Sequence, residues 1–204
     1  MHVKLTKIAV PLVALAIGLF PCFATQAHEH IMDHSMHEHM QPGFTISTAT
    51  YTAPDLKLMD SNGTEVALHE LLNGKTPVIL NFIYTSCTTI CPVMSSTFQQ
   101  IQLKLGKRKV RMLSVSIDPE NDTPAKLKEY AHKYKAGVQW KLLTGTLENS
   151  IAVQRAFGVL AGDKMDHKPV TLLKAPGTGD TWVRIEGLAD AGVVMHELDK
   201  FKAK

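Results

Sequence analysis

A nearly continuous apolar run, PVILNFIY at residues 77–84, constrains the fold more than any other stretch of the chain. A run of this kind is typical of a central parallel strand buried on both faces, because a strand with one exposed face alternates polar and apolar residues. A second run, KVRMLSVSID at 109–118, has the pattern of the next strand. The two runs predict an α/β domain with a buried central sheet.

Helical patterns follow both runs. Pro92 suits the first position of a helix that ends at Gly106. The tripeptide DTP at 122–124 starts another helix, which ends by Gly137. The remaining elements are a short strand at 138–145, a helix at 147–157, a hairpin of strands at 169–176 and 181–187, and a last helix at 188–202. This order predicts a thioredoxin-like domain, with a central β-sheet flanked by helices.

The N-terminal 27 residues have the composition of a signal peptide. Lys4 and Lys7 precede an uncharged, largely apolar segment at 8–27, and Thr25 and Ala27 occupy the −3 and −1 positions of a cleavage site before His28. An uncleaved anchor is the alternative, because about 20 uncharged residues can span a bilayer. With either reading we expect the domain to be exported to the periplasm, soluble or tethered to the inner membrane.

Residues 28–50 are predicted to be a mobile tail ahead of the domain at 51–204, because the stretch has no helical or strand period. Its candidate metal ligands, imidazoles and thioethers suited to copper in either oxidation state, are His28, His30, Met32, His34, Met36, His37, His39 and Met40. Elsewhere the composition is ordinary. A net charge of +3, with no basic stripe among aromatics, gives no support for a nucleic-acid partner.

Cys87 and Cys91 lie between the first strand and its helix. A helix N-terminus favours the thiolate, which both binds metals and attacks disulfides. Residues four apart at a helix start lie roughly 5–6 Å apart between Cβ atoms, whereas a disulfide needs about 4 Å. The spacing therefore suits two thiolates around one soft ion such as Cu(I) at least as well as a disulfide. A purely stabilising disulfide is disfavoured, because closing so short a loop contributes little entropy.

The segments FIYTSCTTICPVM and LSVSIDPENDTPAKLKEYA resemble the Sco/SenC family, copper-handling proteins assigned to cytochrome oxidase assembly. The resemblance covers roughly residues 51–190. The residues that match the family pattern are Cys87, Cys91, Pro92, Asp118, Pro119, Asp122, Thr123 and Pro124.

The family resemblance implies His167 as a third copper ligand. It lies in an Asp-His motif, with Lys168 where the family has serine, and Pro169 stands where thioredoxins place a cis-proline. Asp118 is either an outer partner of the site or a turn cap, and we expect Asp122 and Thr123 to be helix caps. The histidines expected to be ordinary surface residues are His69, His132 and His196.

The sequence thus predicts a periplasmic copper chaperone, more a metallochaperone than an enzyme, that delivers copper to a cytochrome oxidase subunit or another cuproprotein. The alternative is a thiol–disulfide oxidoreductase, with Cys87 and Cys91 as redox thiols, that keeps cuproprotein cysteines reduced. A membrane contact is expected only through an uncleaved N-terminal segment. A peroxidase is disfavoured, because LNFIYTSC lacks the proline and threonine positions that peroxiredoxins have before their reactive cysteine.

Overall fold

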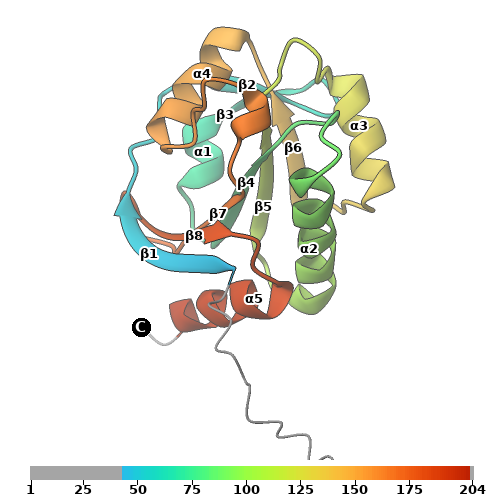
Figure 1. The fold of residues 1–204 in the computed structure, drawn as a ribbon. Coiled ribbons are helices and arrows are strands. Elements are labelled where there is room, and N and C mark those ends of the chain that lie inside the picture. Colours follow the sequence, from blue (N-terminus) through green and yellow to red (C-terminus); the bar gives the residue numbers. More distant parts are fainter. Residues whose placement is uncertain (1–42, 203–204) are drawn as a thin grey trace, which may run out of the picture. The chain divides into compact units, whose positions relative to one another are not determined.

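An eight-stranded mixed sheet forms the centre of the domain (Figure 1). The computed structural model describes residues 43–202. The strands are β1 (Phe44–Thr50), β2 (Lys57–Asp60), β3 (Glu65–Ala67), β4 (Val78–Ile83), β5 (Arg111–Ser116), β6 (Trp140–Thr144), β7 (Val170–Lys174) and β8 (Thr181–Gly187). Their order across the sheet is β1-β8-β7-β4-β5-β6-β2-β3.

The predicted buried strand is the centre of this sheet. All six residues of β4 are buried, and the strand pairs parallel to β5 and antiparallel to β7. Leu80 lies between Leu113 of β5 and Leu172 of β7. The predicted hairpin is confirmed as well, because β7 and β8 pair antiparallel.

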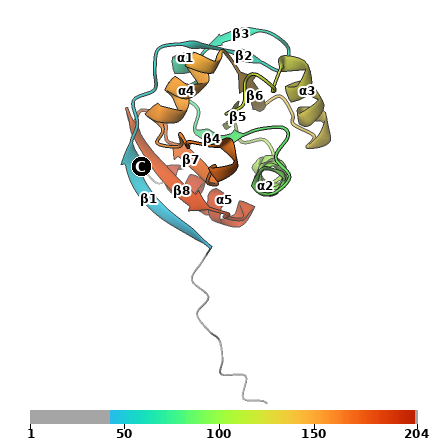
Figure 2. The ribbon, with the colours of Figure 1, turned by 45° about the horizontal axis from the view of Figure 1, so that its top comes forward.

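Helices cover both faces of the sheet. They are α1 (Leu68–Leu72), α2 (Ile90–Leu105), α3 (Pro124–Lys133), α4 (Leu147–Ala156) and α5 (Ala191–Asp199), with short 3-10 turns η1 (Lys164–Asp166) and η2 (Lys200–Lys202). Two successive crossovers, β4-α2-β5 and β5-α3-β6, have the same hand and place α2 and α3 on one face. Figures 1 and 2 show α4 on the opposite face, and α5 beside α2.

Three loops converge at one edge of this sheet. Because β4 and β5 are parallel, the loops that leave their carboxyl ends lie side by side. Strand β7 runs the other way, with Thr171 opposite Asn81 of β4, so the loop that precedes β7 reaches the same edge. The topology therefore brings together the cysteine loop (residues 84–89), the loop after β5 (residues 117–123) and the histidine loop (residues 163–169).

Several boundaries differ from the sequence prediction. Phe44–Thr50 form β1, paired with β8, so the tail predicted at 28–50 is wrong from residue 44 onward. Helix α2 begins at Ile90, which makes Pro92 its third residue. Proline is tolerated there because the first amides of a helix have no partner within the helix. The short elements β2, β3 and α1 were not predicted.

Candidate functional site

The two cysteines lie at the junction of β4 and α2, and they interact. Both thiols are free. The Cys91 amide, in the first turn of α2, donates to Cys87 Sγ at 3.4 Å, and Thr89 Oγ1 lies 3.7 Å from the same sulfur. Cys87 is 7% exposed and Cys91 is completely buried. The pair thus has an outer and an inner thiol.

The surroundings of the two thiols push their pKa values apart. Burial opposes ionisation of Cys87, but hydrogen bonds from the Cys91 and Thr89 amides outweigh it and lower the pKa of Cys87 to about 7. Burial, together with the hydrogen bond and charge of Cys87, raises the pKa of Cys91 to about 12. As the pH rises above about 7, the site therefore holds a thiolate on Cys87 and a protonated thiol on Cys91.

This difference in pKa predicts how the rate of alkylation of the thiols depends on pH. The rate at which Cys87 is alkylated by iodoacetamide should rise as the pH increases through about 7, and level off above it, because only the thiolate reacts. Mass spectrometry after timed alkylation would measure it, with Cys87→Ser as the control that leaves only the slow inner thiol. A midpoint near 9, the ordinary value, would contradict the asymmetry.

His167 is buried beside the end of β4. Its Nε2–H donates to the Phe82 carbonyl at 3.1 Å, and its Nδ1 has no hydrogen-bond partner among residues 43–202. Burial lowers the pKa of His167, so the ring is neutral and Nδ1 carries a free lone pair. A buried nitrogen of this kind fits a metal ligand. As they stand, however, no three His, Cys, Asp or Glu side chains within the described residues are arranged to hold a metal ion.

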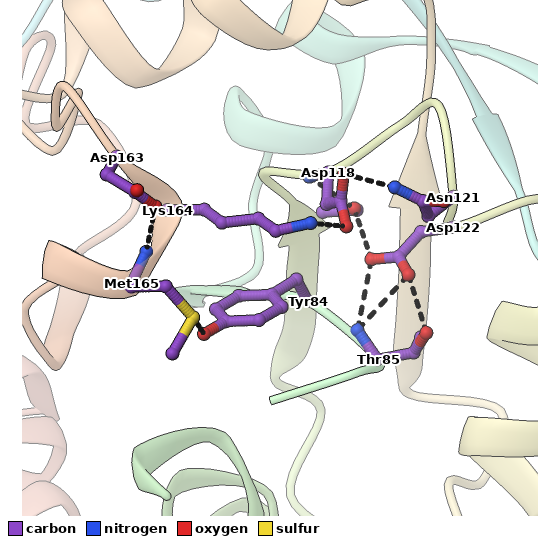
Figure 3. A network of polar contacts seen from close by, with 9 residues as sticks. Tyr84, Thr85, Asp118, Asn121, Asp122, Asp163, Lys164 and Met165 are labelled. Atoms are coloured by element: carbon purple, nitrogen blue, oxygen red, sulfur yellow. Dashed lines mark hydrogen bonds and ion pairs between the residues drawn. The ribbon is translucent and has the colours of Figure 1, made fainter. Parts of the chain in front are cut away.

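Two carboxylates, those of Asp122 and Asp118, hold the loops near the cysteines in place through hydrogen bonds and an ion pair (Figure 3). Asp122 is fully buried and accepts hydrogen bonds from the Thr85 amide and hydroxyl and from Ser116 Oγ, the last two at 2.6 Å. It ties the cysteine loop to β5, so the expectation that it caps a helix is wrong. The expectation for Thr123 is confirmed, because its Oγ1 accepts from the Lys126 amide at the start of α3.

Asp118 ties the histidine loop to the same edge. Its Oδ2 lies 2.6 Å from Lys164 Nζ and its Oδ1 accepts from Asn121, and these contacts outweigh burial and lower the pKa of Asp118. Figure 3 shows this ion pair, and Lys164 lies three residues before His167 in the sequence. Asp118 thus holds the loop that carries His167 in place through Lys164, and its role as an outer partner of the site stays a prediction.

Tyr84 and Met165 join the site, and the sequence analysis did not single them out. The buried Tyr84 hydroxyl donates to Met165 Sδ at 3.4 Å and also interacts with the Cys87 thiol. Burial, with that interaction, raises the pKa of Tyr84 to about 12, so the phenol keeps its proton. Tyr84 follows the buried run directly, and its position next to the cysteine loop was the only signal in the sequence.

The remaining predicted residues lie elsewhere. His69, His132 and His196 are all exposed, as expected. The peptide bond before Pro169 is trans, unlike the cis-proline of thioredoxins. The signal segment and the tail ligands His28, His30, Met32, His34, Met36, His37, His39 and Met40 lie outside the described residues. Within residues 43–202 no helix has the length and apolar character needed to cross a membrane.

Comparison of the sequence with known proteins identifies a matching family and several relatives. A family model described as SCO1/SenC matches residues 45–178. The SCO1 protein homolog of Bacillus subtilis is 36% identical over 104 residues, which are 50% of this chain and 53% of that protein. A protein of Stutzerimonas stutzeri, named as one expected to bind copper, is 32% identical over 109 residues, 52% of each chain. The chain thus spans about half the length of these curated relatives.

Among solved structures, that of yeast Sco1 with copper bound shares the fold. Its TM-score is 0.63 at 22% identity, and the match covers 76% of this chain and 95% of the yeast chain. The thioredoxin-like fold predicted from the order of elements is therefore confirmed.

Proposed function

Because the chain belongs to the SCO1/SenC family, we propose that it binds a copper ion and delivers it to a cuproprotein, such as a cytochrome oxidase subunit, in the periplasm. The ligands would be the sulfurs of Cys87 and Cys91 and the imidazole of His167. The observation that carries this proposal is the pair of free, interacting thiols that follows β4, together with a buried imidazole at the end of the same strand whose Nδ1 has no partner in the described part of the chain. The copper-binding name of the Stutzerimonas stutzeri relative supports it.

The donor set suits both oxidation states of copper. Thiolates are soft ligands that favour Cu(I), and an added imidazole nitrogen allows Cu(II) to be held. Cys87 offers a thiolate at neutral pH, while Cys91 releases its proton as the metal binds. Since Nε2–H of His167 is occupied by the Phe82 carbonyl, Nδ1 is the nitrogen available to the metal.

An anaerobic titration of the reduced protein with Cu(I) and Cu(II), together with the reduction potential of its thiol pair, tests this function. Tight binding of one copper at the cysteine pair and a low potential would support the chaperone. Weak copper binding with fast reduction of a disulfide substrate would overturn it in favour of the alternative below.

The alternative is a thiol–disulfide oxidoreductase, and the unequal thiols favour it. The more exposed Cys87 thiolate would attack a partner disulfide and release one partner thiolate, leaving a mixed disulfide. Cys91 would then lose its proton and attack Cys87 Sγ, which releases the second partner thiolate and leaves a Cys87–Cys91 disulfide. The partner would be reduced and this chain oxidised.

His167→Ala separates the two functions. We expect a much larger loss of affinity for Cu(II) than for Cu(I), because Cu(I) accepts two thiolates alone, whereas Cu(II) prefers a nitrogen in its ligand set. Thiol–disulfide exchange should stay close to wild type. Competition titrations in both oxidation states and a disulfide-reduction assay would measure the difference.

Two exposed histidines provide matched controls for this variant. His132→Ala and His196→Ala should change neither copper affinity nor exchange, since both side chains lie on the surface. An equal loss for both oxidation states in His167→Ala would mean that the residue supports the fold rather than the metal.

The tail would act as an acquisition arm for copper. If cleavage precedes His28, the mature chain starts His-Glu-His, and the amine, two amides and the His30 imidazole can surround Cu(II) with four nitrogens. Deleting residues 28–40 should remove additional copper and slow loading from a chelator, without changing the visible band of the cysteine site. N-terminal sequencing of the exported protein is the first check. An unchanged loading rate would contradict the role in transfer.

A further inference from the structure

We propose that Met165 and Cys87 together form an outer copper position, through which Cu(I) passes to the Cys87–Cys91 pair. The inference rests on the proposed function, because it takes copper as the cargo of the two cysteines. It adds a thioether ligand from the histidine loop that the sequence analysis did not single out.

The two sulfurs share one neighbour. The Tyr84 hydroxyl donates to Met165 Sδ at 3.4 Å, and the same phenol interacts with the Cys87 thiol. Figure 3 shows the Met165 sulfur directed at the Tyr84 hydroxyl from the histidine loop. Tyr84 is 3% exposed, so its hydroxyl is held in a fixed position next to Met165 Sδ.

Exposure of the three sulfur residues falls from solvent inward. Met165 is 69% exposed, Cys87 is 7% exposed and Cys91 is completely buried. A copper ion that arrives from outside therefore meets the thioether first and the inner thiol last. A large apolar side chain gains little by lying so far in solvent, whereas a thioether is a soft ligand for Cu(I) that needs no deprotonation.

The loop that carries Met165 is held on both sides. Asp163 Oδ1 accepts from the Met165 amide at 2.8 Å, and Lys164 Nζ lies 2.6 Å from Asp118 Oδ2 on the β5 side (Figure 3). These contacts keep the thioether near the cysteine loop although its side chain is in solvent. The position is thus defined by the fold, as an outer metal position requires.

The transfer is a ligand exchange in which copper stays Cu(I). The ion first binds Met165 Sδ and the Cys87 thiolate. The Cys91 thiol then gives its proton to water, and its sulfur replaces the thioether on copper. No electron moves, and Met165 is free to receive the next ion once the cargo has left.

The direct test is NMR of the full-length, reduced protein with ¹³C-labelled methionine methyl groups, titrated anaerobically with Cu(I). Met165→Leu identifies the Met165 signal. In Cys91→Ser, where copper cannot move inward, we expect the Met165 methyl signal to shift. In Cys87→Ser it should not move. A signal that stays in place in Cys91→Ser, or shifts equally in Cys87→Ser, would overturn the shared position.

Loading kinetics supply a second readout. Met165→Leu should reach the same final copper content but load from a Cu(I) chelator more slowly, by roughly tenfold, the low end of the effect of outer partners on metal sites. Met59→Leu is the matched control, because Met59 is also exposed, at 39%, but lies in strand β2. If the cysteines bind copper while Met165→Leu loads at the wild-type rate, only this inference fails. If they bind no copper, the proposed function fails with it.

Discussion

Cys87→Ser and Cys91→Ser should each abolish the stoichiometric copper site. Without both thiolates the chain keeps at most the weak outer position at Met165 and Cys87, which does not hold copper stoichiometrically against solvent ligands, and a serine hydroxyl is a hard, neutral donor that soft copper disfavours. In the wild-type protein Cu(II) should produce a sulfur-to-copper charge-transfer band in the visible range. The band should be lost in both variants, and absorption titration of the reduced protein would measure it.

Ser86→Ala is the matched control for both variants. Ser86 lies in the same loop next to Cys87, and its side chain is exposed. It should keep the band and the stoichiometry of one copper per site. Should both cysteine variants keep the band, the copper site would lie elsewhere in the chain and the central proposal would be wrong.

Asp122→Ala should have the largest effect on folding stability. The change removes a buried carboxylate that accepts from Thr85 and Ser116, and it leaves the Thr85 amide without its acceptor. We expect the free energy of unfolding to fall by about 3–5 kcal/mol, because the Thr85 amide, the Thr85 hydroxyl and Ser116 Oγ lose their acceptor and each buried donor left unpaired costs about 1–3 kcal/mol. Urea unfolding of the reduced protein would measure it.

Two further variants serve as comparisons for Asp122→Ala. Asp122→Asn keeps an oxygen for Thr85 and should cost less than the alanine change. Asp55→Ala removes a carboxylate whose side chain is 94% exposed, and its effect should stay within about 0.5 kcal/mol. If Asp122→Ala were as mild as Asp55→Ala, the cysteine loop would not depend on this carboxylate.

The parts of the fold that could be predicted from the sequence are those that depend on local patterns. The nearly continuous apolar run predicted the central place of β4, and Thr123 before Pro124 marked the start of α3. Strand β1 was missed, because its residues FTISTAT are mostly small and polar and follow directly on the histidine-rich stretch. Its partner β8 is far away in the sequence, so no local pattern announces the pairing.

For the site as well, features that depend on local sequence could be predicted, whereas contacts between distant segments could not. The spacing of Cys87 and Cys91 within one short segment indicated that the two residues would interact, and the Cys91 amide donates to Cys87 Sγ. Asp122 precedes a helix and has the chemistry of a cap, yet tertiary contacts with Thr85 direct it into the interior. Tyr84 and Met165 are in contact although 81 positions separate them in the sequence, so no pattern of local spacing could predict this contact.

The pairing of β1 with β8 sets a limit on how early the domain can complete its folding. Some 130 residues separate the two strands, and at ~5–20 residues per second their synthesis takes on the order of 10 s. During that time β1 has no partner, and pairing across so long a loop is slow even afterwards. An unpaired strand is a template for aggregation when it is apolar. The three threonines and one serine of β1 therefore suit a segment that must wait in water for its partner.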